Sequence, residues 1–98
     1  MHTKKELIDK VTPLFSNYPI HKAALFGSYA RNEQNENSDF DIFLEFSEPI
    51  GLRYGSLYLD LKEVLPVDVG LMTKAGLEEQ SDYFKESALK DMEIFYEK

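Results

Sequence analysis

The sequence contains no cysteine among its 98 residues. Disulfide bonds and cysteine-ligated zinc sites are therefore excluded, and a reducing compartment is compatible with the chain. No apolar run approaches the roughly 20 residues that a membrane-spanning helix requires. The first residues, Met1–Glu6, also lack the long apolar segment of a secretory signal peptide. We therefore expect a cytoplasmic protein without a membrane partner.

Basic residues are scarce. The chain has 11 Lys and Arg against 18 Asp and Glu, which gives a formal net charge of −7. Proteins that bind long nucleic acids through the phosphates usually present a basic face. Here the basic residues are scattered along the chain, so we expect no long nucleic acid as partner. A metal-bridged anion or a basic protein surface fits this charge better.

Apolar residues are plentiful enough for one core, at 43% of the chain with 13% aromatic residues, and we expect a single domain over 1–98. Hydrophobic spacing and turn residues predict helices over 4–15, 28–32, 52–65, 74–79 and 81–90, and strands over 22–26, 40–46, 67–72 and 94–96. Thr3, Ser28 and Ser81 are the expected N-caps. This order predicts an α/β (α+β) fold, with helices packed on a small mixed sheet of three to four strands.

Two carboxylates stand at the start of the second expected strand, at Asp39 and Asp41. Residues i and i+2 of a strand point to one face and lie about 6.6 Å apart. Both carboxylates should therefore share a face, while Phe40 and Ile42 face the core. Two like charges this close raise each other's pKa unless a cation lies between them. Mg²⁺ suits such a position because it prefers oxygen ligands and also binds phosphate oxygens.

A third carboxylate, Asp68, lies between two valines of the next expected strand. Three carboxylates at one edge of a sheet can hold two metal ions about 3.5–4 Å apart, an arrangement that supports phosphoryl or nucleotidyl transfer. Plainer roles remain open for each residue taken alone. Asp39 can close a turn, Asp41 can lie on a solvated face, and Asp68 can be a hydrogen-bonded residue at a strand edge. The loop that precedes Asp39 favours the metal site.

Gly27 and Ser28 stand where a strand is expected to meet a helix. The free N–H groups of a helix start favour an anion, and glycine lets a phosphate approach the backbone closely. Ser28 adds a hydroxyl, and Arg31 can supply positive charge to the same phosphates. Alone, this pattern is more often a glycine turn with a serine cap and Arg31 as a surface residue. Its weight comes from the spacing: Gly-Ser, ten residues, then Asp-x-Asp.

The segment GSYARNEQNENSDFDIFLEF resembles the Gly-Ser, ten-residue gap, Asp-x-Asp motif of the DNA polymerase beta-like nucleotidyltransferases. More narrowly, it resembles the minimal nucleotidyltransferases of bacteria and archaea. PVDVGLM is similar to the family's strand with the third carboxylate, and ESALKDMEIFYEK to the end of such chains. The resemblance spans nearly the whole chain and implies a polymerase beta-like palm. Asn32 departs from the family's frequent glycine, but asparagine tolerates left-handed backbone angles.

The resemblance implies a chemistry and its residues. A hydroxyl attacks the α-phosphorus of a nucleoside triphosphate, and pyrophosphate leaves. Asp39, Asp41 and Asp68 would hold two divalent ions, Mg²⁺ or alternatively Mn²⁺, and Asp68 would also help to activate the hydroxyl. Gly27 and Ser28 would hold the phosphates. All three carboxylates are present, which favours an active enzyme.

Small members of this family are often encoded beside all-helical HEPN proteins, with which they form toxin–antitoxin pairs. The resemblance therefore implies an antitoxin that transfers a nucleoside monophosphate, AMP from ATP, to a hydroxyl of a HEPN-type toxin. A homo- or hetero-oligomer is compatible with this. The alternative is a non-catalytic acidic subunit that neutralises its partner by binding. A third hypothesis, a metal-dependent ribonuclease, leaves the Gly-Ser turn unexplained.

Overall fold

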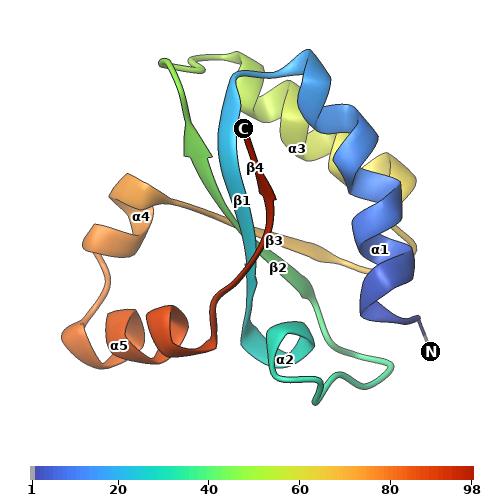
Figure 1. Cartoon of the computed structure of the whole chain (residues 1–98), viewed down its shortest axis with the longest axis vertical. Coiled ribbons are helices and arrows are strands. Elements are labelled where there is room, and N and C mark those ends of the chain that lie inside the picture. The colour runs from blue at the N-terminus through green and yellow to red at the C-terminus, as the bar shows by residue number, and fades with distance from the viewer. Residues whose placement is uncertain (1) are drawn as a thin grey trace.

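The computed structural model describes residues 2–98 and has a four-stranded mixed sheet at its centre (Figure 1). The strands are β1 (Ile20–Phe26), β2 (Phe40–Phe46), β3 (Val69–Thr73) and β4 (Glu93–Glu97), and their order across the sheet is β3-β2-β1-β4. β2 runs parallel to β3, whereas β1 runs antiparallel to both of its neighbours. The expected mixed sheet of three to four strands is confirmed.

In the described part of the chain, five α-helices and one 3₁₀ helix accompany the sheet: α1 (Lys4–Val11), the 3₁₀ helix (Thr12–Asn17), α2 (Gly27–Ala30), α3 (Arg53–Val64), α4 (Lys74–Glu78) and α5 (Asp82–Asp91). None of the helices within residues 2–98 has the length and apolar character needed to cross a membrane. Two expected N-caps are confirmed, because Thr3 accepts from the Glu6 N–H and Ser81 from the Phe84 N–H.

Three local predictions were wrong. Ser28 does not cap α2, because the helix begins at Gly27 and its N-cap, Phe26, makes no side-chain cap bond. The first helix changes to 3₁₀ form at Thr12, since Pro13 has no N–H to continue the α-helical pattern. Asp68 lies just before β3 rather than inside a strand, because the chain is still turning out of α3 when it reaches this residue.

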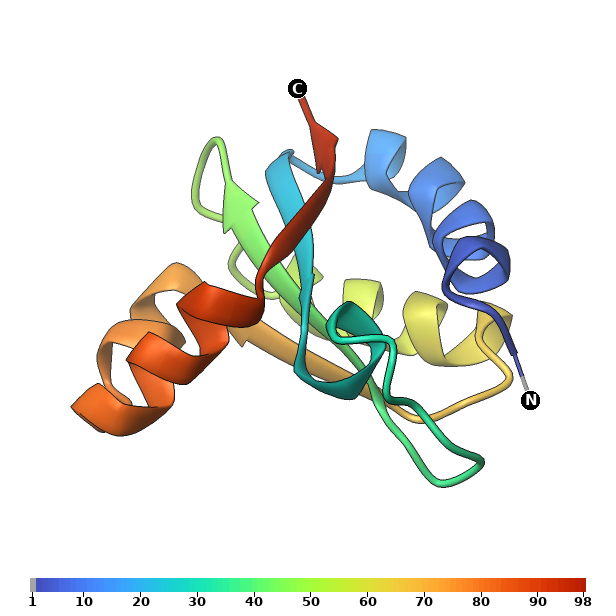
Figure 2. The same ribbon diagram turned by 60° about the horizontal axis from the view of Figure 1, so that its bottom comes forward.

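The two faces of the sheet are covered by different helices, with α1 and α3 on one face and α4 and α5 on the other (Figures 1 and 2). The main core lies on the α1–α3 side and includes Phe40, Ile42 and Leu44 of β2, all fully buried. A smaller cluster packs under α4 and α5; its buried members are Ala24, Phe43, Leu77 and Ala88. Because side chains alternate along a strand, β2 contributes to both clusters.

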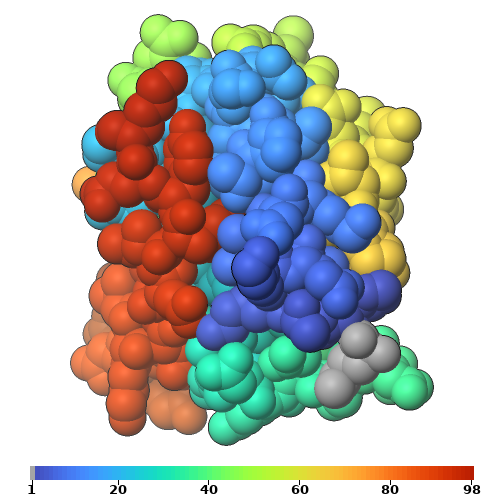
Figure 3. Space-filling view, turned by 45° about the vertical axis from the view of Figure 1, so that its right-hand side comes forward, coloured from blue at the N-terminus to red at the C-terminus, as the bar shows by residue number. Residues whose placement is uncertain are grey.

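The C-terminal strand lies against α1 and the 3₁₀ helix that follows it, as the red and blue surfaces of Figure 3 show. The Lys4 Nζ is 2.8 Å from a carboxylate oxygen of Glu93. The ring of Phe15 packs against Phe95 and Tyr96, with centroids 6.0 and 5.1 Å away. These contacts hold β4 against α1 and the 3₁₀ helix, while strand pairing holds it beside β1.

Candidate active site

The register of the sheet brings three chain segments together at one end. On β1, Phe26 pairs with Asp41 and is followed directly by Gly27. On β3, Gly70 pairs with the same Asp41. The Phe40 N–H donates to the carbonyl of Asp68 at 2.8 Å, so the residues that precede β2 and β3 also lie side by side. Asp41 therefore stands between two glycines from separate parts of the chain.

The carboxylate of Asp41 fills the space above both glycines. A Cβ atom at Gly27 would meet Oδ2 of Asp41, and one at Gly70 would meet Oδ1, each closer than the 3.0 Å that real Cβ atoms respect. Gly27 also has a φ of 74°, a left-handed angle that favours glycine. Any side chain at either position would have to displace the carboxylate.

The charge of Asp41 is poorly compensated. None of the ion pairs formed by residues 2–98 includes it. The pKa of its carboxyl is raised from 3.8 to about 6; partial burial is the largest cause, the neighbouring charge of Asp39 adds to it, and the charge of Arg31 acts in the opposite direction. A cation beside Asp41 would offset both unfavourable contributions.

Asp39 and Asp68 are exposed and line one polar cavity of about 350 Å³, together with Ser38 and Lys62. Asp39 thus lies in the same cavity as Asp68, and its charge also raises the pKa of Asp41. Within residues 2–98, no three acidic or histidine side chains are gathered into a group that could hold an ion. The side chains nevertheless fit a hard divalent cation, because Asp39, Asp41 and Asp68 offer carboxylate oxygens. The carboxylate of Asp41 is also partly buried, and no ion pair within residues 2–98 balances its charge.

The expected phosphate-binding residues lie on the same end of the sheet. α2 is a single turn, and Arg31 is its C-cap residue. The guanidinium of Arg31 donates from Nη1 to Asp91 at 2.8 Å and from Nε to Glu33 at 3.1 Å. Asn32 has a φ of 59°, so the left-handed turn expected of this residue is present.

Gly70 and Asp91 are the site residues that sequence reasoning missed. Gly70 had a detectable signal, because a glycine inside a short apolar strand often marks the close approach of another group. Asp91 had none, since it lies 60 residues from its partner Arg31. Only the packing of α5 beside α2 shows the pair.

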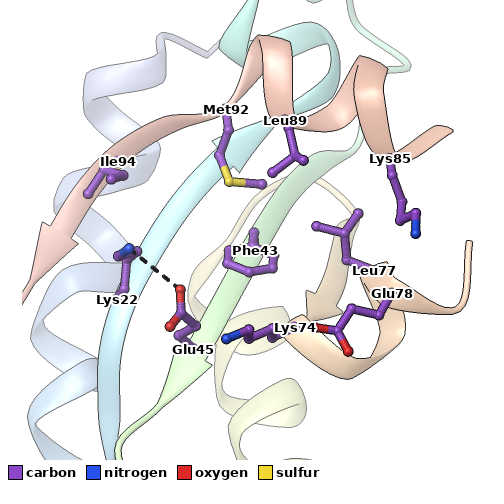
Figure 4. A pocket seen from close by; sticks show the side chains of 10 residues that line it. All are labelled: Lys22, Phe43, Glu45, Lys74, Leu77, Glu78, Lys85, Leu89, Met92 and Ile94. Carbon is purple, nitrogen blue, oxygen red and sulfur yellow. Dashed lines mark ion pairs between the residues drawn. The ribbon is translucent and has the colours of Figure 1, made fainter. Parts of the chain in front are cut away.

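A second, apolar cavity of about 480 Å³ lies between the sheet, α4 and α5 (Figure 4). Phe43, Leu77 and Met92 line it, and the ion pair between Lys22 and Glu45, 3.5 Å long, stands at one side. It contains none of the predicted catalytic or phosphate-binding residues. The three predicted metal ligands lie instead between the two glycines (Asp41) and in the polar cavity (Asp39 and Asp68).

A comparison with protein families matches residues 4–95 to the family described as Nucleotidyltransferase domain. The chain belongs to this family. It is 40% identical over 90 residues to a Methanocaldococcus jannaschii protein that is provisionally named a protein adenylyltransferase; the match covers 91% of this chain and 83% of that nucleotidyltransferase. It is also 35% identical over 75 residues to the protein adenylyltransferase MntA of Thermococcus cleftensis, covering 76% and 69% of the two chains.

Solved structures show the same fold. A minimal nucleotidyltransferase, also provisionally named, superposes with a TM-score of 0.70 at 26% identity, covering 91% of this chain and 89% of that one. A toxin–antitoxin crystal structure with AMP-PNP gives 0.70 at 22% identity, covering 92% and 73%. A Shewanella oneidensis complex of a tri-AMPylated HEPN toxin with an MNT antitoxin gives 0.54 at 18%, covering 96% and 66%. The chain is thus a nucleotidyltransferase with the fold of the minimal members.

Proposed function

We propose that this nucleotidyltransferase is a metal-dependent protein adenylyltransferase, which transfers AMP from ATP to a hydroxyl of a HEPN-type toxin and thereby acts as an antitoxin. The observation that carries the proposal is the carboxylate of Asp41. It lies half-buried between Gly27 and Gly70, has no ion-pair partner among residues 2–98 and has a pKa raised to about 6. A group that is destabilised in this way is typical of a catalytic site rather than of a structural one.

Each named residue has a role in this proposal. Asp39, Asp41 and Asp68 would hold Mg²⁺, or Mn²⁺ in its place, and the bound ion would offset the charge of the reacting phosphates. Gly27 and Ser28 would contact the phosphates, and Arg31 would add positive charge. The absence of a cap bond supports this use of Ser28, because its hydroxyl is not committed to α2.

The reaction is an in-line displacement at phosphorus. The acceptor oxygen forms a bond to the α-phosphorus, and the bond from that phosphorus to the oxygen bridging to the β-phosphate breaks. Pyrophosphate carries away the electron pair of the broken bond. Asp68 is exposed and belongs to the polar cavity, and we assign it to receive the hydroxyl proton.

The relatives support the choice of nucleotide and partner. The similar Thermococcus cleftensis protein is a protein adenylyltransferase. Two structures of the same fold are a toxin–antitoxin with AMP-PNP and an MNT antitoxin in complex with a tri-AMPylated HEPN toxin. The net charge of −7 favours a basic protein as the acceptor, since complementary charge accelerates encounter.

Intact-mass spectrometry of the chain co-expressed with the product of a neighbouring HEPN gene tests the proposal. The expected result is a partner that gains the mass of one or more AMP groups. The matched control is the double variant Asp39→Asn with Asp41→Asn, which should leave the partner unmodified. Incubation of the purified proteins with each labelled nucleotide and Mg²⁺ then identifies the nucleotide.

The second candidate function is neutralisation by binding alone, which the strongly acidic charge also favours. The same experiment separates the two functions. If the double variant neutralises the partner as well as the wild type does, and the partner never gains mass, then binding is the function and the catalytic proposal fails.

A further inference from the structure

Two carboxylates bind the guanidinium of Arg31, and the two ion pairs differ in strength. Asp91 accepts from Nη1 at 2.8 Å and its side chain is 17% exposed, whereas Glu33 accepts from Nε at 3.1 Å and is 67% exposed. Solvent screens the second pair more than the first. In agreement, Asp91 is the larger of the two influences that raise the pKa of Arg31 above its ordinary value.

The elements that carry the two carboxylates also differ. Asp91 is the last residue of α5, which is anchored on the sheet by buried Ala88 and by the neighbouring Met92. Glu33 lies in the exposed loop that follows α2. Asp91 can therefore fix the position of a long, flexible arginine side chain, which Glu33 cannot do as well.

One edge of the guanidinium remains available. An arginine has five N–H donors in a planar fork, and the bonds to Asp91 and Glu33 use Nη1 and Nε. Within residues 2–98, Nη2 of Arg31 has no hydrogen-bonded or ion-paired carboxylate. The guanidinium is also close enough to Asp41 for its charge to lower the pKa of that carboxyl.

A triphosphate at this site needs such a charge. α2 has only four residues, so its dipole supplies little positive potential. We propose that Asp91 is a positioning residue: it holds the guanidinium of Arg31 near Asp41 and leaves the Nη2 edge free to bind a phosphate of the nucleotide. This inference rests on the proposed function, because it concerns the triphosphate of the same site.

Calorimetric titration with an unhydrolysable ATP analogue and Mg²⁺ tests the role of Asp91. Asp91→Ala should weaken binding about tenfold, the effect of one charge-assisted hydrogen bond. Asp91→Asn, which keeps a hydrogen-bond acceptor, should recover part of the affinity. Glu33→Gln should change binding about twofold or less. The matched control is Glu93→Ala, which removes a nearby acid that pairs with Lys4 instead of Arg31 and should leave binding unchanged.

A double-mutant cycle separates positioning from a purely structural role. If Asp91 acts through Arg31, the variant with both Asp91→Ala and Arg31→Ala binds the analogue no more weakly than Arg31→Ala alone. AMP, which lacks the β- and γ-phosphates, should lose less affinity than the triphosphate in Asp91→Ala.

Two results overturn the inference while leaving the proposed function intact. One is a folded Asp91→Ala variant that binds the triphosphate as the wild type does. The other is a double variant whose loss of affinity equals the product of the losses measured for Asp91→Ala and Arg31→Ala alone. A wild-type chain that binds no triphosphate in the presence of Mg²⁺ would overturn both the inference and the proposed function.

Discussion

The two faces of β2 differ in their surroundings, although the strand has only seven residues. Phe40, Ile42 and Leu44 point into the main core and are fully buried. Asp41 and Glu45, on the opposite face, are half-buried, and only Phe43 between them is packed under helices. The first set holds the fold together, whereas the second carries a destabilised carboxylate at one end and borders an apolar cavity at the other.

The difference comes from the helices that cover each face. α1 and α3, together with the 3₁₀ helix, bury one face of β2 along its length. α4 has five residues and α5 ten, and they cover the middle of the opposite face. Asp41 and Glu45, at the two ends of that face, are only partly buried. A strand can thus serve stability on one side and chemistry on the other, because its side chains alternate.

The largest effect is expected for Asp41→Asn. The variant should lose at least about 10³-fold in nucleotidyl transfer, because a metal ion contributes several kcal/mol to such reactions. Its fold should be retained, since no ion pair of the described chain involves Asp41. Label incorporation and near-ultraviolet circular dichroism measure the two properties. Activity above a tenth of the wild-type value would contradict the assignment.

Substitutions on the core-facing side of β2 should instead lower the stability of the fold. Ile42→Ala should lower the free energy of unfolding by about 3 kcal/mol, because it leaves a cavity at a fully buried position. The matched control on the other face is Glu45→Gln, which removes only a partly exposed ion pair with Lys22 and should cost less than about 1 kcal/mol. Urea denaturation measures both. Equal losses would show that the two faces do not differ as described.

The pH dependence of stability should carry the signature of Asp41. Its pKa in the folded chain is about 6 against an ordinary value of 3.8, so the folded state holds this proton more tightly. The free energy of unfolding should therefore fall as pH rises from about 4 to 6 and then level off. After allowance for solvent screening, the loss is about 1–2 kcal/mol. Subtracting the profile of Asp41→Asn isolates this contribution, and two parallel profiles would contradict it.

Gly70→Ala should act through the carboxylate that it displaces. The added Cβ would collide with Oδ1 of Asp41, so the affinity for Mg²⁺ should fall about fivefold, close to 1 kcal/mol. In an Asp41→Ala background the collision is absent, and Gly70→Ala should stabilise the strand by about 0.5–1 kcal/mol. Metal titration and urea denaturation provide the measurements. A Gly70→Ala variant with unchanged Mg²⁺ affinity would show that the glycine is not needed.

The smallest effect on stability is expected for Ser28→Ala. A lost N-cap costs about 1 kcal/mol, but Ser28 does not cap α2. The free energy of unfolding should therefore change by less than about 0.5 kcal/mol, within the range of surface substitutions. Affinity for the triphosphate should nevertheless fall about threefold to tenfold. A destabilised variant with normal affinity would restore the structural role that the sequence suggested.

Much of the fold was predictable because its signals are local. The core positions of Phe40 and Ile42 in β2 and the caps at Thr3 and Ser81 depend on neighbouring residues, and all three predictions were confirmed. The cap at Ser28 was wrong because α2 begins at Gly27, one residue earlier than the pattern indicated, so that Ser28 lies inside the helix rather than before it.

The sequence by itself determined which residues bear the candidate chemistry, since the Gly-Ser turn and the Asp-x-Asp pair are defined by their spacing along the chain. Only the tertiary structure decided what surrounds them. The register places Gly70 beneath Asp41, and the packing of α5 brings Asp91 to Arg31 across 60 residues. Burial then raises the pKa of Asp41. Strand register and helix packing depend on the fit of whole apolar faces, which neighbouring residues alone do not specify.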